Sequence, residues 1–172
     1  VIGAEAFLSG CKTNTKYGAT INFTPDDIAY LNEIAETILP KTNTPGAKEA
    51  KVGEFMQVYV KDCLEEKDQK TFMEGMQKLN DACSAKNGKG FMDCTPQQRH
   101  DLLVALDKEA KDYQGKKKED EPQHYFSIMK QLSLYGFFTS EVGATKALRY
   151  VAIPGRYEGC IPYKKGDKAW AT

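Results

Sequence analysis

The sequence lacks both an excess of charge and a long apolar run. Lys and Arg together number 24, and Asp and Glu also number 24, so the formal net charge of the 172 residues is zero. Binding to a phosphate backbone needs a basic excess on at least one face, which argues against a nucleic-acid partner. No apolar stretch reaches the roughly 18 to 20 residues that span a bilayer. The length suits one globular domain with a core of its own.

The sequence is also poor in the motifs that carry chemistry. It holds two histidines, His100 and His124, and no Cys-x-x-Cys, His-x-x-x-His or Cys-x-x-Cys-His pattern, so a zinc or haem site is not expected. Gly-x-Ser-x-Gly is absent, and nothing marks His124 as a base for Ser140. We therefore predict no catalytic residue, no metal ligand and no cofactor in this chain, and expect it to serve a partner.

Five cysteines make an odd set for an exported protein. If Cys11 carries a lipid, four remain, and four cysteines allow three pairings. Cys83 and Cys94 flank a stretch that is rich in Gly, Asn and Ser, so a disulfide between them would close a short flexible loop. The alternative for this pair is two free buried thiols in a reducing compartment.

The first residues suggest an export signal. Leu8-Ser9-Gly10-Cys11 matches the box that precedes lipid attachment in bacterial lipoproteins, and it follows an apolar stretch. Residues 12–20 are polar and would act as a tether. We therefore assign residues 1–23 to a signal remnant with its lipobox and tether, and predict Cys11 as the lipid attachment site. A plain N-terminal helix is the alternative, because a basic segment before the apolar stretch is missing.

Residues 24–172 are predicted to form one all-α domain, with a bundle of about five helices over residues 24–139. Thr24-Pro25 and Thr95-Pro96 are strong helix starts, each with a capping residue and a proline in the first turn. Apolar residues at helical spacing then predict helices over 24–39, 48–65, 67–86, 95–110 and 123–139. Residues 115–122 form a charged linker of mixed sign.

The last part of the sequence, which we call the C-terminal arm (residues 140–172), changes character. It is rich in Gly, Pro and aromatic residues and shows little periodicity. Irregular segments of this length usually serve a function, such as binding a partner. Tyr150, Arg156, Tyr157 and Trp170 are of the types that dominate binding energy at protein interfaces, so we predict them as interface residues. The alternative is that they pack back on the bundle.

Two stretches, residues 36–64 and 136–162, resemble the gluconate 2-dehydrogenase subunit 3 family, which is the small subunit of flavin-dependent sugar and sugar-acid dehydrogenases. The likeness extends over about residues 24 to 171. The features that carry it are Leu39-Pro40, Thr44-Pro45-Gly46-Ala47, Val52-Gly53, Phe55, Thr139-Ser140-Glu141-Val142-Gly143, Tyr150, Pro154-Gly155, Tyr157, Gly159-Cys160 and Trp170.

The resemblance implies a complex at the bacterial envelope. A large FAD-containing flavoprotein of the glucose–methanol–choline oxidoreductase type would carry out hydride transfer, and a cytochrome c often passes the electrons on. The small subunit would have no redox centre, would support folding, export and stability of the large one, and would commonly carry the twin-arginine signal. Periplasmic location and a lipid anchor at the membrane are expected with it.

The resemblance also gives Cys160 a role, because in some members a cysteine of the tail bridges to the large subunit. Pairing of Cys160 with Cys63 inside the chain is the rival. A different function altogether, a stand-alone envelope-anchored helical module that binds a small molecule in a cleft, is the alternative to the subunit role.

Overall fold

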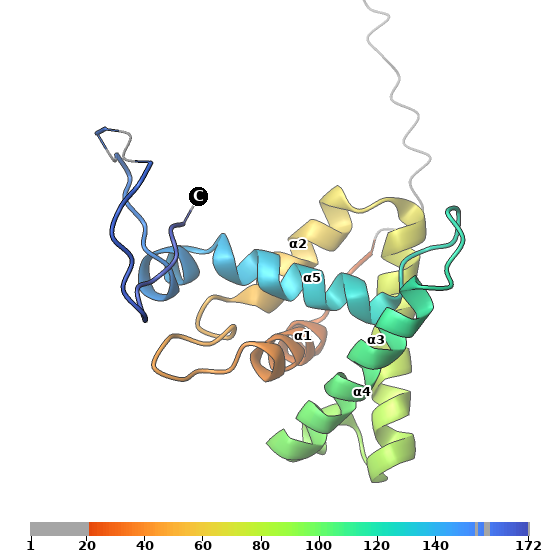
Figure 1. The fold of residues 1–172 in the computed structure, drawn as a ribbon. Coiled ribbons are helices and arrows are strands. Elements are labelled where there is room, and N and C mark those ends of the chain that lie inside the picture. The colour runs from red at the N-terminus through yellow and green to blue at the C-terminus, as the bar shows by residue number, and fades with distance from the viewer. Residues whose placement is uncertain (1–20, 154, 157–158, 172) are drawn as a thin grey trace, which may run out of the picture.

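The computed structural model describes residues 21–153, 155–156 and 159–171 (Figure 1). It confirms the all-α prediction, because the described residues form helices and no named strand. Two short helices, η1 and η2, lie beside the five longer ones. In chain order the elements are α1 (Pro25–Ile38), α2 (Val52–Cys63), α3 (Glu66–Asn87), η1 (Phe91–Asp93), α4 (Pro96–Gln114), α5 (Tyr125–Phe138) and η2 (Gly143–Ala147).

The predicted helix starts at Thr24 and Thr95 are confirmed in their atomic detail. The Thr24 hydroxyl accepts a hydrogen bond from the Asp27 backbone N–H (3.2 Å), and the Asp27 carboxylate accepts one from the Thr24 N–H (2.8 Å). Thr95 and Gln98 repeat the same reciprocal pair at the start of α4. Each pair satisfies backbone donors that a helix start leaves without a partner.

The prediction that the second helix begins near residue 48 is wrong, because α2 begins at Val52. Residues 47–51 form turns instead, and Lys51 has a left-handed backbone (φ 54°) that ends the turn and starts the helix. The Glu36 carboxylate holds this segment in place by accepting hydrogen bonds from the N–H groups of Lys41 (2.9 Å) and Lys48 (2.8 Å). The loop therefore folds back on α1, which delays the helix.

α5 is the central helix of the bundle. It packs against each of the other four long helices, and Figure 1 shows it crossing the middle of the molecule. Its mean hydropathy is the highest of the five long helices, as expected of a helix covered on most sides. Its buried residues are Phe126, Ile128, Met129, Leu132, Ser133, Gly136 and Phe137. The C-terminal arm follows directly from it, so the position of α5 fixes where the arm leaves the bundle.

Replacing Gly53 with alanine is expected to destabilise the protein by about 1 to 3 kcal/mol, a typical cost of overpacking. Gly53 is buried where α2 meets α1, and a Cβ there would lie 2.6 Å from the Ile28 carbonyl oxygen. The Gly53 N–H also donates to the Asn32 side chain on α1 (2.8 Å). This hydrogen bond would be broken if α2 moved away from α1 to make room for the Cβ. Urea denaturation would measure the loss.

Gly115→Ala is the matched control for this substitution. Gly115 has a right-handed helical backbone (φ −70°), and a Cβ there would meet only backbone oxygens at 3.8 Å. Its effect on the free energy of unfolding should therefore be small. Equal stability of the two variants would show that α1 and α2 do not depend on close approach at Gly53.

Candidate functional site

The C-terminal arm projects from the end of α5, away from α3 and α4 (Figure 1). Its first part is a joint, residues 140–147, which contains the helix η2. The rest runs out along an outgoing limb, residues 148–153, and comes back along a returning limb, residues 159–171. Every described residue from 150 to 170 is exposed to solvent. The arm is thus the largest part of the described chain that the bundle does not cover.

The joint is built by close contacts at Ser140 and Gly143. The Ser140 hydroxyl donates to the Phe137 carbonyl (2.6 Å) and accepts from the Gly143 N–H (2.9 Å). A Cβ at Gly143 would lie 1.9 Å from the Phe137 carbonyl oxygen, so no other residue fits without movement of the backbone. η2, a single wide turn of helix, then directs the chain into the outgoing limb. Ser140 therefore has a structural role, and no contact joins it to His124, whose Nδ1 accepts from the Phe126 N–H.

A second set of contacts links the joint to the loop between α1 and α2. Lys146 of the joint pairs with Glu49 (Nζ to Oε1 3.1 Å), and Lys41 lies on the other oxygen of the same carboxylate (3.7 Å). The hydrogen bond from Lys146 holds the pKa of Glu49 below its ordinary value. These groups are exposed, so their contribution to stability is small. Their main effect is to favour one direction of the joint over others.

The two limbs are clamped together at the base by Arg149 and Trp170. The Arg149 N–H donates to the Ala169 carbonyl (2.8 Å), and the Ala171 N–H donates to the Arg149 carbonyl (3.0 Å), which makes an isolated parallel bridge. The Arg149 guanidinium lies over the Trp170 ring, 3.8 Å from its centroid. A cation over an aromatic face is attracted by the ring quadrupole. The arm is therefore a closed loop with a fixed base.

Several apolar and aromatic side chains of the arm are exposed, including the Trp170 ring of the clamp itself. The exposed fraction is 56% for Tyr150, 85% for Ile153, 77% for Tyr163 and 48% for Trp170. Tyr150, Arg156, Cys160 and Trp170, all predicted as interface residues, are exposed as a partner would need. Tyr157 and the proposed lipid site Cys11 lie outside the described residues. Sequence reasoning did not single out Ile153 and Tyr163, although they belong to the same irregular, aromatic-rich segment.

The cysteines fall into two groups. Cys63, at the end of α2, and Cys160, on the returning limb, are both exposed and are not bonded to one another. Cys83 and Cys94 are buried, and their Sγ atoms lie 3.1 Å apart. Cys83 and Cys94 are thus in contact but not bonded, so the disulfide between them stays a prediction. The rival pairing of Cys160 with Cys63 has no contact to support it.

A groove of about 320 Å³ lies between α2, α3 and α5. It is the kind of feature that the alternative function, a small-molecule binding module, would need. Tyr59 and Tyr135 pack edge to face at its wall (centroids 5.6 Å apart), and the buried Oδ1 of Asp68 has no hydrogen-bond partner among the described residues. Its volume is at the low end for ligand pockets. The residues that line it are Tyr59, Leu64, Asp68, Gln123, Ile128, Gln131, Leu132 and Tyr135.

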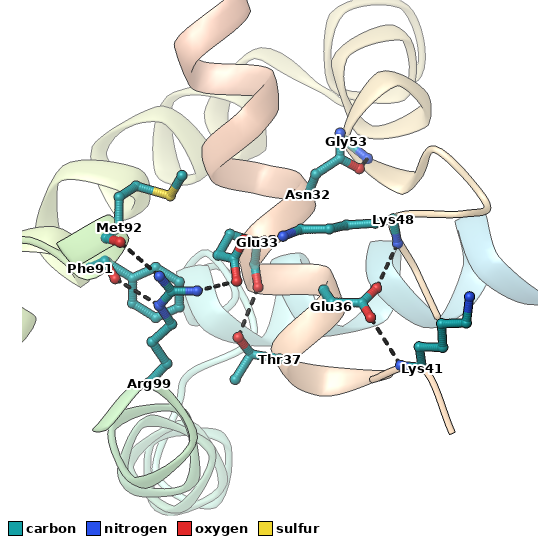
Figure 2. A network of polar contacts seen from close by, with 10 residues as sticks. All are labelled: Asn32, Glu33, Glu36, Thr37, Lys41, Lys48, Gly53, Phe91, Met92 and Arg99. Carbon is teal, nitrogen blue, oxygen red and sulfur yellow. Dashed lines mark hydrogen bonds and ion pairs between the residues drawn. The ribbon is translucent and has the colours of Figure 1, made fainter. Parts of the chain in front are cut away.

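The densest polar cluster surrounds α1, and its contacts are structural (Figure 2). The Glu33 carboxylate pairs with Arg99 of α4 and with Lys48 of the loop that precedes α2. Arg99 also donates to the carbonyls of Phe91 (2.9 Å) and Met92 (2.7 Å) in η1. Each of these charges is already engaged by a partner within the fold. The cluster therefore fastens η1 and the loop to α1.

The described residues contain no group of three His, Cys, Asp or Glu side chains that could hold a metal ion. Among the helices that the structure describes, none is long and apolar enough to cross a membrane.

A family model described as gluconate 2-dehydrogenase subunit 3 matches residues 25–155, which is most of the chain. The chain belongs to this family. The match includes the five long helices, the joint and the outgoing limb, and it ends before the returning limb. No curated protein and no solved structure matches the chain. Family membership makes the chain a subunit of a dehydrogenase complex.

Several features that carried the resemblance have structural roles in the family's fold. A Cβ at Gly46 would lie 2.3 Å from Glu36 Oε1, so Gly46 lets the loop approach α1. Gly53 does the same for α2, and Gly143 does so for the joint. These glycines thus shape the loop before α2 and the joint that directs the arm in this chain.

Proposed function

We propose that this chain is the non-catalytic small subunit of a flavin-dependent sugar or sugar-acid dehydrogenase that faces the periplasm. Its role is to support folding, export and stability of a catalytic flavoprotein of the glucose–methanol–choline oxidoreductase type. FAD belongs to that partner, and a cytochrome c subunit accepts its electrons. Membership of the subunit 3 family supports this assignment.

The observation that carries the proposal is the exposed, clamped arm. The arm leaves Ile153 85% and Tyr163 77% exposed, so both are accessible to a partner that would bury them. The Arg149–Trp170 clamp and the Gly143 joint fix the base of the loop before binding. A surface that is ordered in advance loses less conformational entropy when it binds. The arm therefore has the exposed apolar side chains and the fixed base that are expected of a segment that binds a partner.

The charge of the arm indicates what kind of surface it meets. Residues 148–172 contain five basic residues and two acidic ones, a net charge of +3 in a chain whose total is zero. The remaining 147 residues therefore carry −3. Complementary charge steers association and fixes orientation. The flavoprotein is accordingly expected to present an apolar patch with an acidic rim to the arm.

Native purification of the tagged full chain from the organism that encodes it tests this function. The expected eluate is yellow, shows flavin absorbance and contains a second chain of oxidoreductase size. A second chain that separates only after reduction would identify Cys160 as the cysteine of a bridge between subunits, and Cys160→Ser would then remove the bridge. A colourless single chain under gentle extraction would contradict the subunit role, and would favour ligand binding in the groove beside Asp68.

We also propose that Cys11 carries a lipid that anchors the complex. The motif Leu8-Ser9-Gly10-Cys11 supports this. In cells, Cys11→Ser is expected to move the dehydrogenase activity from the membrane fraction to the soluble fraction, because a single thioether-linked lipid site would be lost. Cys63→Ser is the control, since it removes an exposed thiol without touching the box or the arm. An unchanged membrane fraction in the Cys11 variant would rule out this anchor.

A further inference from the structure

The side chains of Cys83 and Cys94 lie close together, but no bond joins their sulfur atoms. Cys83 lies in the last turns of α3, and Cys94 follows η1 directly. Their Sγ atoms are 3.1 Å apart, and the exposed fractions of the two residues are 0% and 4%. Non-bonded heavy atoms in contact usually lie about 3.5 to 4.0 Å apart, and a disulfide is about 2.05 Å long. The two sulfur atoms therefore have about 1 Å to close before they reach bonding distance.

We propose that Cys83 and Cys94 form a disulfide in the mature protein, and that this bond locks the segment 88–95 onto α3. The segment carries Phe91, which is fully buried and lies with its ring edge to face against Tyr30 (centroids 5.6 Å apart). The Phe91 N–H donates to the Asn80 side chain on α3 (3.0 Å). Phe91 lies inside the loop that a bridge between residues 83 and 94 closes, so the bridge holds Phe91 against Tyr30 and Asn80.

Other uses of the two thiols fit the site less well. A metal needs further ligands, and the described residues offer no group of three His, Cys, Asp or Glu side chains here. A redox catalyst keeps one sulfur accessible to its substrate, whereas both of these residues are buried. The hydrogen-bond neighbours of the sulfurs, Asn87 and the Lys89 carbonyl, are weak partners at 3.6 and 3.9 Å. A structural disulfide is the use that the geometry supports.

The oxidation requires a disulfide oxidant, either a thiol–disulfide oxidoreductase or oxidised glutathione. The two thiols lose two protons and two electrons as the Sγ–Sγ bond forms, and the oxidant's own disulfide is reduced to two thiols. Burial raises the pKa of the Cys83 thiol, so little thiolate is present once the fold has closed. Both residues are also buried in the folded chain, out of reach of an oxidant. The bond therefore forms while segment 88–95 is still open, and the folded protein then shields it from reductants.

Peptide mapping of the refolded chain tests the proposal, and it does not depend on the proposed partner. The full chain is refolded with reduced and oxidised glutathione, alkylated in denaturant without reductant, and cleaved with trypsin. The expected product joins the peptides 79–86 and 90–99, while Cys63 and Cys160 are alkylated. Alkylation of both Cys83 and Cys94 would overturn the proposal, and so would a bridge from either of them to any other cysteine.

Thermal unfolding adds a second measurement with a matched control. Reduction is expected to lower the Tm of the oxidised wild type by about 5 to 10 °C, because the unfolded chain regains the freedom of the loop. The double variant Cys63→Ala, Cys160→Ala should respond to reductant as the wild type does. The double variant Cys83→Ala, Cys94→Ala should not respond. If this last variant fails to fold, the response of the wild type and its peptide map still decide the question.

Discussion

Replacing Arg99 with methionine is expected to lower the free energy of unfolding by about 2 to 3 kcal/mol, which is less than the roughly 3 to 5 kcal/mol for breaking a fully buried ion pair, because this pair is partly buried. The Arg99 side chain is only 13% exposed and its partner Glu33 is 16% exposed. The same guanidinium donates to the carbonyls of Phe91 and Met92, and it lies 5.5 Å from the centroid of the Phe91 ring. Its loss removes the guanidinium donor of the Met92 carbonyl, and leaves the Phe91 carbonyl with the Cys94 N–H and Glu33 with Lys48. Methionine supplies only the apolar part of the side chain.

Urea denaturation followed by circular dichroism would measure this loss, with Lys78→Met as the control. Lys78 also pairs with a glutamate, Glu74 (3.4 Å), but both side chains are about half exposed on α3. Exposed pairs one helical turn apart contribute about 0.3 to 0.5 kcal/mol, so the control should unfold nearly like the wild type. A similar stability of the two variants would mean that Arg99 is not needed to fasten η1 to α1 and α4.

The helices of the bundle could be predicted from the sequence because their signals are local. A capping threonine followed by proline marks the starts of α1 and α4, and each cap is completed by a residue three positions further on. Leu31 and Ile34 lie one turn apart and are both fully buried, as the apolar spacing predicts. Local chemistry of this kind depends little on the rest of the fold.

The start of α2 could not be predicted because a distant residue sets it. Residues 48–51 have ordinary helical composition, and the apolar spacing of the helix continues naturally from them. In the structure, Glu36 on α1 binds the backbone N–H of Lys48, and Ala47 is fully buried against the bundle. Tertiary contacts thus override the local preference. The joint at Gly143 is similar, because its tight contact with Phe137 depends on how α5 ends.

The arm could be predicted as a functional segment, but the contacts that hold its two limbs together could not. Composition alone separated residues 140–172 from the bundle and placed Tyr150 and Trp170 among the candidates. The clamp joins Arg149 to Trp170 across most of the arm's length, and no periodic pattern links residues so far apart in an irregular segment. The pair Cys83 and Cys94 was predictable in part, because both cysteines flank one short flexible loop.

The double variant Ile153→Ala, Tyr163→Ala is expected to weaken binding to the flavoprotein about 100-fold, which corresponds to about 2.7 kcal/mol. The two side chains are the most exposed large apolar residues of the described arm, and they lie on opposite limbs. Neither takes part in the Arg149–Trp170 clamp. Their removal should therefore reduce the contact area while the arm keeps its base, and helix content and Tm should stay unchanged. Titration of the purified flavoprotein against each variant would measure the affinity.

Val58→Ala with Val104→Ala is the matched control, because it also removes two exposed apolar side chains. Val58 on α2 and Val104 on α4 are 57% and 55% exposed, and both belong to the bundle rather than to the arm. This control should bind like the wild type. Weaker binding by the control, with no change in the arm variant, would place the interface on the bundle. Weaker binding by both variants would mean that the interface includes both the arm and the bundle. Loss of helix content in the arm variant would mean that Ile153 and Tyr163 stabilise the fold and do not act as binding residues.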